Sequence, residues 1–190
     1  MNVCLFGASS PQIAARYIEA TEQLGAMLAD AGHTLVYGAG GAGLMGAAAR
    51  GVKRRGGTVV GVVPSFLQVD GILYDGCNEM IYTETMRERK AIMEDRADAF
   101  LIVPGGIGTY EELFEVYTLK QLGRHSKPIV VYNLYGYYDE LLAMLQTTVD
   151  EDYMPAASLE LIAVETTAQG VLQRITETAA APDIHRTKYV

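Results

Sequence analysis

The residue types best suited to chemistry gather near the middle of the chain, in a segment that follows an apolar run ending at Pro104. Three glycines come first (Gly105, Gly106 and Gly108), and Thr109, Glu111 and Glu112 follow them. Glycines let a ligand approach the backbone closely, and a helix that begins here offers free N–H groups to an anion. We expect a phosphate-binding loop in which Thr109 caps the helix and both glutamates lie in its first turn.

The alternative for this segment is a tight strand-to-helix turn whose two acids only compensate the helix dipole.

A second segment, residues 84–96, concentrates Arg87, Arg89 and Lys90 in one expected helical turn. Arginine is the side chain best suited to bidentate recognition of oxyanions, and in a parallel sheet this helix begins at the ligand-binding edge. A solvated helix with internal ion pairs, such as Glu84–Arg87, stays equally open.

Two further glycine-containing loops follow expected strands. Residues 38–46 contain a G-x-G-x-x-G match, but residues 58–64 supply no acid where a dinucleotide fold needs one, which favours a phosphate- or ribose-contacting loop over an NAD site. Residues 7–10 could donate hydroxyl and N–H groups or simply cap the first helix. These loops add four candidate substrate-binding residues: Ser9, Gly41, Gly43 and Met45.

The elements that would position these loops alternate along the whole chain. Apolar runs predict strands at residues 3–6, 34–37, 58–63, 80–82, 99–103, 129–132 and 161–164. Helical spacing occupies residues 11–31, 43–55, 85–96, 109–122, 137–150 and 167–179. This alternation predicts an α/β fold, a three-layer, doubly wound, Rossmann-like parallel sheet with helices on both faces. We expect one nucleotide-monophosphate-binding domain over residues 1–190, with 181–190 as a frayed tail and ligands held by loops 7–11, 38–43, 63–75 and 104–108.

Composition narrows the function further. The chain has 190 residues and a net charge of −8, with no basic stripe, which argues against a nucleic-acid surface. It has no apolar run long enough for a membrane helix and no signal-peptide pattern, and Cys4 and Cys77 form no CxxC, so we expect a reduced, cytoplasmic protein. His33 and His125 lie in helix-to-strand loops, away from the ligand edge, and we expect neither a metal site nor a cofactor.

Three motifs together carry a resemblance to a known family. Residues 104–112 fit PGGxGTxxE, residues 86–90 fit M-x-x-R-K, and residues 40–46 read GGAGLMG. Over residues 1–178 the chain resembles the LOG ("Lonely guy") family, whose members are often labelled lysine decarboxylases. Such enzymes cleave the N-glycosidic bond of N6-prenylated adenosine monophosphate, and many accept AMP. One departure is Arg87, which stands where many relatives carry histidine.

The resemblance implies roles for particular residues. Arg89 and Glu112 would be the catalytic pair, with Lys90 beside them. Phosphate and ribose would contact Gly105, Gly106, Gly108, Thr109 and Glu111, with Thr118 further along the same helix. The resemblance also implies a homodimer. A decarboxylase would need an electron sink such as pyridoxal phosphate, for which Lys90 beside an arginine pair is weak support.

The chemistry of the residues agrees with hydrolysis of an N-glycoside. A carboxylate from Glu112 or Glu111 can stabilise an oxocarbenium-like state at the ribose C1′ and orient the attacking water. Arg89 can act on the base, the ribose, the phosphate or Glu112. The competing class is a nucleotide-binding module without turnover, which needs no acid–arginine pair. The sequence leaves open whether the base is prenylated or plain adenine, and we expect residues 63–75 to line its pocket.

Overall fold

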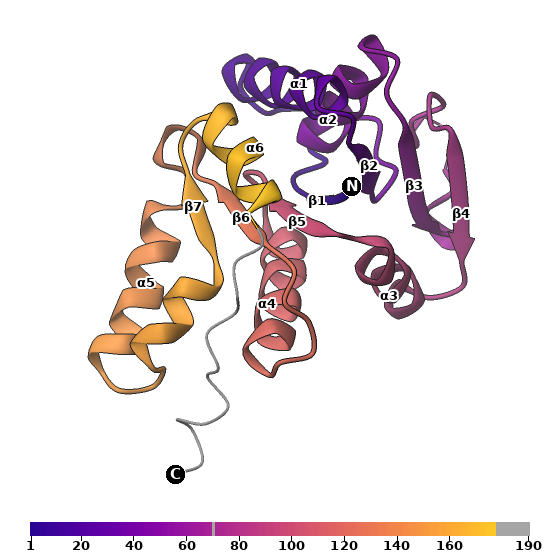
Figure 1. Cartoon of the computed structure of the whole chain (residues 1–190). Coiled ribbons are helices and arrows are strands. Elements are labelled where there is room, and N and C mark those ends of the chain that lie inside the picture. The colour runs from indigo at the N-terminus through magenta and orange to yellow at the C-terminus, as the bar shows by residue number, and fades with distance from the viewer. Residues whose placement is uncertain (70, 178–190) are drawn as a thin grey trace.

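Seven strands form one sheet in the computed structural model, which describes residues 1–69 and 71–177 (Figure 1). The predicted α/β fold is confirmed, and every strand pairs in parallel with its neighbour. The frayed tail predicted at 181–190 lies outside the described residues. The strands are β1 (Asn2–Phe6), β2 (Thr34–Tyr37), β3 (Val59–Pro64), β4 (Glu79–Thr83), β5 (Ala99–Ile102), β6 (Ile129–Tyr132) and β7 (Ala163–Glu165).

Helices cover both faces of the sheet, which is why the central strands are continuously apolar. One core joins the sheet to α1 (Ala15–Asp30), α2 (Gly43–Arg54) and α6 (Ala168–Thr176). The other joins it to α3 (Met86–Arg96), α4 (Ile107–Gln121) and α5 (Asp139–Asp150). Short 3-10 helices lie at Ser65–Leu67, Leu134–Gly136 and Ala156–Leu161. The three predicted layers are therefore present (Figure 1).

Some predicted boundaries were wrong. The first helix begins at Ala15 rather than at residue 11, because residues 11–14 form a turn. Helix α4 begins at Ile107, so its N-cap is Gly106 and not Thr109. As a result Glu111 and Glu112 lie beyond the first turn. The last strand begins at Ala163, because residues 156–161 are a 3-10 helix.

The order in which the chain adds strands to the sheet reverses at β1, near the centre of the sheet. The order is β4-β3-β2-β1-β5-β6-β7, so the chain builds outward from β1 and then crosses to β5 on its other side. In open parallel sheets the crevice at such a switch point, outside the carboxyl ends of the strands, is where ligands bind. The loops after β1 and β5 flank this crevice, and both contain candidate residues.

Helices α1 and α2 approach each other at two glycines. A Cβ at Gly51 would lie 2.0 Å from the carbonyl oxygen of Glu22, and one at Gly25 would lie 2.2 Å from that of Ala48. Because these neighbours are backbone atoms, a methyl group can be accommodated only if the helices separate. The close packing of this layer therefore depends on both glycines.

We predict that Gly51→Ala lowers the free energy of unfolding by about 2 kcal/mol, the cost typical of overpacking a core. Gly108→Ala is the matched control, because a Cβ there has no atom within 4 Å. It should leave stability unchanged or raise it by about 0.5 kcal/mol through helix propensity. Urea unfolding of the two variants measures the difference, and equal midpoints would contradict the packing role of Gly51.

Candidate active site

A cavity of about 590 Å³ lies at the carboxyl edge of the sheet. All four predicted loops contribute to it, together with the first turn of α3 and the start of α4. Its lining consists of Gly7, Ser9, Ser10, Gly38, Gly40, Met45, Val63, Leu67, Ile72, Leu73, Met86, Arg89, Gly106, Gly108, Thr109, Glu111 and Glu112. The cavity thus unites glycine loops, hydroxyl groups, an acid–arginine pair and an apolar wall.

Arg89 and Glu112 form a buried ion pair in this cavity. The Nη1 of Arg89, on α3, donates to Oε1 of Glu112, on α4, at 2.9 Å, and each residue is 8% exposed. Burial raises the pKa of the Glu112 carboxyl above its ordinary value, although Arg89 opposes the shift. The pair therefore places a carboxylate that is easier to protonate than a surface glutamate at the wall of the cavity.

The guanidinium of Arg89 is fixed from several sides. Its Nε donates to the carbonyl oxygen of Val62 at 3.3 Å, and its Nη1 also approaches the sulfur of Met86 at 3.5 Å. Its Nη2 lies over Gly38, where a Cβ would be only 2.2 Å away. Helix α3 itself begins with a capping box, in which Thr85 and Glu88 bond each other's backbone N–H groups. These contacts hold the arginine in one orientation.

A second group of charges joins the two helices beside the cavity, with Glu111 at its wall. Lys90 pairs with Glu111 and with Glu115, the latter at 2.6 Å. Burial lowers the pKa of Lys90, but the hydrogen bonds that Lys90 donates to these two acids outweigh it, and the net shift is upward. Burial and the charge of Glu115 raise the pKa of Glu94 to about 7. Arg89 and Lys90 therefore pair across to α4, whereas Arg96 pairs with Glu79 on β4.

The start of α4 presents free backbone donors to the cavity. The N–H of Tyr110 is the first to donate to an intrahelical carbonyl, that of Gly106, at 3.0 Å, so the amides of residues 107–109 precede the helical ladder. A Cβ at Gly106 or Gly108 would meet no atom within 4 Å, whereas one at Gly105 would lie 2.1 Å from Oγ1 of Thr109. Gly105 thus serves the packing of the protein, and the other two leave space open.

The structure brings eight predicted site residues to the cavity wall: Arg89, Glu112, Gly106, Gly108, Thr109, Glu111, Ser9 and Met45. Five others do not line it: Lys90, Gly105, Thr118, Gly41 and Gly43. Thr118 is exposed, about two turns beyond Glu111 on α4. The N–H of Gly41 donates to the carbonyl of Ile72 at 2.8 Å, and Gly43, with φ 60°, packs against the backbone of Ala8. These two glycines hold the lining loops together.

Several lining residues were absent from the sequence candidates. Gly38 and Gly40 belong to the G-x-G-x-x-G match, and Gly7 and Ser10 to the first small-residue turn, so their position after a strand was a usable signal. The apolar wall is different: Val63, Leu67, Ile72, Leu73 and Met86. The expectation that residues 63–75 line the pocket predicted most of this apolar wall. No periodicity in that segment indicated which of its side chains would face the cavity.

Neither a metal site nor a membrane-spanning helix is evident in the described part of the chain. Residues 1–69 and 71–177 contain no group of three or more metal-ligating side chains and no helix long and apolar enough to cross a membrane. A ring nitrogen of His125 contacts the carbonyl of Val116 at 2.9 Å, and burial lowers the pKa of both His125 and His33. Both histidines precede strands, at the edge opposite the cavity.

Comparison with known proteins identifies the family. Residues 45–175 match the family model described as "Possible lysine decarboxylase". A probable cytokinin riboside 5′-monophosphate phosphoribohydrolase of rice, LOGL5, is 41% identical over 181 residues, 95% of this chain and 74% of its own. The chain belongs to the LOG family. The phosphoribohydrolase of Mycobacterium tuberculosis is 41% identical over 86% of this chain and 87% of its own, and Arabidopsis LOG2 is 38% identical over 100% and 89%.

Solved structures outside these LOG relatives share the fold. The molybdenum cofactor carrier protein of Chlamydomonas reinhardtii superposes with a TM-score of 0.70 at 21% identity, covering 93% of this chain and 96% of its own. The molybdenum cofactor binding protein of Rippkaea orientalis gives 0.67 at 22% identity, covering 90% and 91%. At such identities the likeness concerns the fold alone. The same fold therefore occurs in proteins that are described as binding or carrying the molybdenum cofactor.

We predict that Gly38→Ala raises the pKa of Glu112 further, because the new methyl displaces the guanidinium that lowers it. Gly106→Ala is the matched control, since its methyl would meet no protein atom. Carbon-13 NMR titration of labelled glutamate side chains measures both variants. An unchanged Glu112 pKa in Gly38→Ala would show that Gly38 does not position the arginine.

Proposed function

We propose that this protein hydrolyses the N-glycosidic bond of adenosine 5′-monophosphates, prenylated at N6 or plain, releasing the free base and ribose 5-phosphate. The observation that carries the proposal is the buried Arg89–Glu112 pair beside an open helix N-terminus in one cavity. Membership of the LOG family, whose relatives are named as phosphoribohydrolases, supports it. The proposal needs no metal and no redox cofactor.

The 5′-phosphate would bind at the start of α4. The backbone N–H groups of residues 107–109 and the hydroxyl of Thr109 are donors there, and the bare Cα atoms of Gly106 and Gly108 let the phosphate approach. The hydroxyl of Ser9 lines the same cavity from the loop after β1. Binding energy from this remote group would hold the ribose so that its C1′ faces Glu112.

Glu112 would stabilise the positive charge that develops on the ribose. Its Oε1 is held by Arg89, and within residues 1–69 and 71–177 no donor bonds its Oε2. Water attacks C1′, the electrons of the glycosidic bond leave with the purine nitrogen, and Glu112 accepts the proton of the water while the base takes one from solvent. Glu111 is paired with Lys90, which favours Glu112 over Glu111 as the carboxylate that acts on the ribose and the water. Arg89 then acts as a positioning residue, since a guanidinium is a poor proton donor.

The base would lie against the apolar wall of the cavity. Leu67, Ile72 and Met86 line it and are also partly exposed, so they form its rim. Such a wall suits the faces of a purine and an apolar substituent at N6.

We also propose a homodimer and a cytoplasmic location. Large apolar side chains are exposed on the segment after β3, on β4 and at the starts of α3 and α4, which supports a second copy covering this face. They are Phe66, Leu67, Val69, Ile72, Tyr82, Met86 and Ile107. Both cysteines are free thiols, which agrees with a reducing compartment.

The decisive experiment incubates the protein separately with AMP and with isopentenyl-AMP and separates free base and ribose 5-phosphate by chromatography. We expect release from at least one of them, and the ratio of the two kcat/KM values reports whether the prenyl group is recognised. Adenosine, which lacks the phosphate, is the control and should react far more slowly. Nucleotide binding in calorimetry without any release would favour a binding module and overturn the proposal.

We predict that Glu112→Gln lowers kcat by about a thousandfold while the nucleotide Kd changes little, because it removes only the charge that stabilises the transition state. Glu111→Gln is the matched control and should keep most activity. In the unchanged protein, kcat should fall as the pH drops through the Glu112 pKa, which burial raises, so the acid limb should lie above the ordinary glutamate value. Normal hydrolysis by Glu112→Gln would refute this assignment.

We predict that Gly108→Ala weakens AMP binding by about tenfold without loss of stability, because its methyl enters the space reserved for the phosphate rather than the protein interior. Binding of adenosine, measured in the same titration calorimetry, should be unaffected. Equal loss for both ligands would show that Gly108 serves the shape of the loop and not the phosphate.

A further inference from the structure

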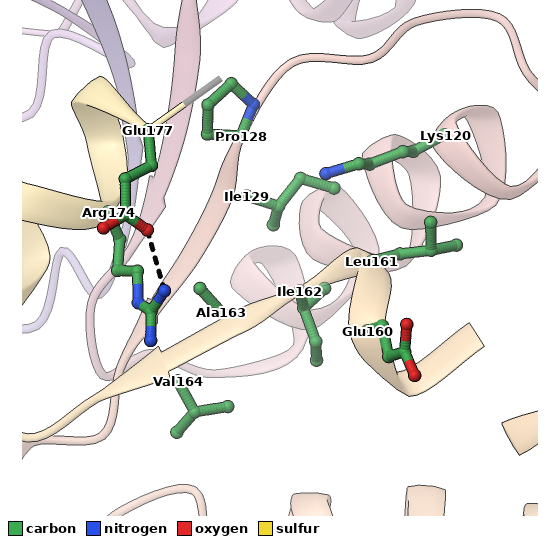
Figure 2. Close-up of a pocket in the computed structure, with 10 residues that line it drawn as sticks. All are labelled: Lys120, Pro128, Ile129, Glu160, Leu161, Ile162, Ala163, Val164, Arg174 and Glu177. Carbon is green, nitrogen blue, oxygen red and sulfur yellow. Dashed lines mark hydrogen bonds and ion pairs between the residues drawn. The ribbon is translucent and has the colours of Figure 1, made fainter. Parts of the chain in front are cut away.

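A second cavity, of about 310 Å³, lies at the opposite edge of the sheet from the candidate active site (Figure 2). It is formed where β6 and β7 begin, between the end of α4 and the last turn of α6. Its lining consists of Lys120, Pro128, Ile129, Glu160, Leu161, Ile162, Ala163, Val164, Arg174 and Glu177. The proposed hydrolysis uses none of these residues.

Lys120 is the unusual member of this set. Only 5% of the residue is exposed, and its Nζ points into the space beside Ile129 (Figure 2). Within the described residues it has no hydrogen-bond acceptor and no ion-pair partner, whereas Arg174 is paired with Glu165 at 2.8 Å and with Glu177 at 2.7 Å. Burying an ammonium group without a partner is unfavourable, because the protein does not replace the hydrogen bonds that water would give it.

Its position in the last turn of α4 offsets part of that cost. The carboxyl end of a helix favours a cation, but no side chain or carbonyl in the described part of the chain accepts from Nζ. Burial accordingly lowers the pKa of Lys120. An anion that entered the cavity would therefore meet a donor already desolvated and already aimed at it.

The remaining lining defines what kind of anion fits. Beside Nζ the walls are the apolar side chains of Ile129, Leu161 and Ile162. Two acids also border the cavity: Glu160, which is exposed, and Glu177, which Arg174 holds. These carboxylates would repel a doubly charged ion such as phosphate, while a single negative charge on an apolar body would satisfy the lysine and cover the walls.

We propose that this cavity is a binding site for a small organic monocarboxylate, with its carboxylate paired to Lys120 Nζ and its apolar body packed on Ile129, Leu161 and Ile162. The site is separate from the catalytic cavity, since it lies at the amino edge of the strands rather than the carboxyl edge. The proposal is independent of the reaction assigned to the other edge. It depends on Lys120, which has no partner among residues 1–69 and 71–177.

The test titrates the full-length protein with benzoate, following its backbone amides by NMR. We expect saturable binding with shifts confined to residues around Lys120, no competition from AMP, and at least tenfold weaker binding of the neutral isostere benzamide and of inorganic phosphate. Lys120→Met should weaken benzoate binding at least tenfold and leave nucleotide binding intact. Lys127→Met is the matched control, because Lys127 already donates to the carbonyl of Glu94 at 2.7 Å, and it should bind benzoate normally.

Three results would overturn the proposal: benzamide binding as well as benzoate, displacement of benzoate by AMP, or unchanged benzoate binding in Lys120→Met. Should Lys120→Met fail to fold, the unmodified protein labelled with ¹⁵N-lysine gives an equivalent test. The Nζ resonance of Lys120 must shift with benzoate and stay fixed with benzamide. Glu160→Gln should strengthen benzoate binding, because it removes a repelling charge at the cavity, and weaker binding in this variant would also contradict the proposal.

Discussion

The pairing of Arg89 with Glu112 is the interaction on which the candidate active site depends. It joins α3 to α4, and a buried carboxylate without a partner would protonate rather than stay charged. Residues of neighbouring strands and loops hold the guanidinium of Arg89 in place beside Glu112. Val62 supplies an acceptor at the end of β3, and the missing side chain of Gly38 supplies the space. Two strands, β2 and β3, and two helices, α3 and α4, therefore have to be in place for this ion pair to form.

Glycine has two distinct uses around this pair. Gly38, Gly43 and Gly105 are required by neighbouring protein atoms, which a Cβ at those positions would strike. A Cβ at Gly106 or Gly108 would have no protein atom within 4 Å, and both residues line the cavity, so they leave open space at the start of α4. The distinction separates residues that shape the cavity from residues that face its contents. It also explains why a glycine-rich motif is poor evidence of contact for any one of its members.

The elements were predictable because parallel strands covered on both faces are continuous apolar runs, such as those at Val59–Pro64 and Ile129–Tyr132. The carboxyl-edge loops then followed from strand order. What the pattern could not supply were contacts between distant residues, such as that between Arg89 and Glu112, which are on different helices; only the family motif joined them. Leu67 and Ile72 lie in a segment without periodicity, so their roles depend on packing that no local pattern encodes. Lys120 differs, because it falls on the buried face of α4 with Val116 and Tyr117, and only its residue type suggested exposure.

The charges around the cavity explain how an acidic protein can hold an anion and still act on it. Arg89 and Lys90 face three acids, Glu111, Glu112 and Glu115, so the side chains of this group carry no excess of positive charge. In the proposed mechanism the phosphate affinity comes from the backbone N–H groups at the start of α4, where no acid in the first turn competes for them. Glu112 would add nothing to that affinity. Its carboxylate becomes favourable only when positive charge develops at the ribose C1′, which is the condition for lowering a barrier rather than tightening a complex.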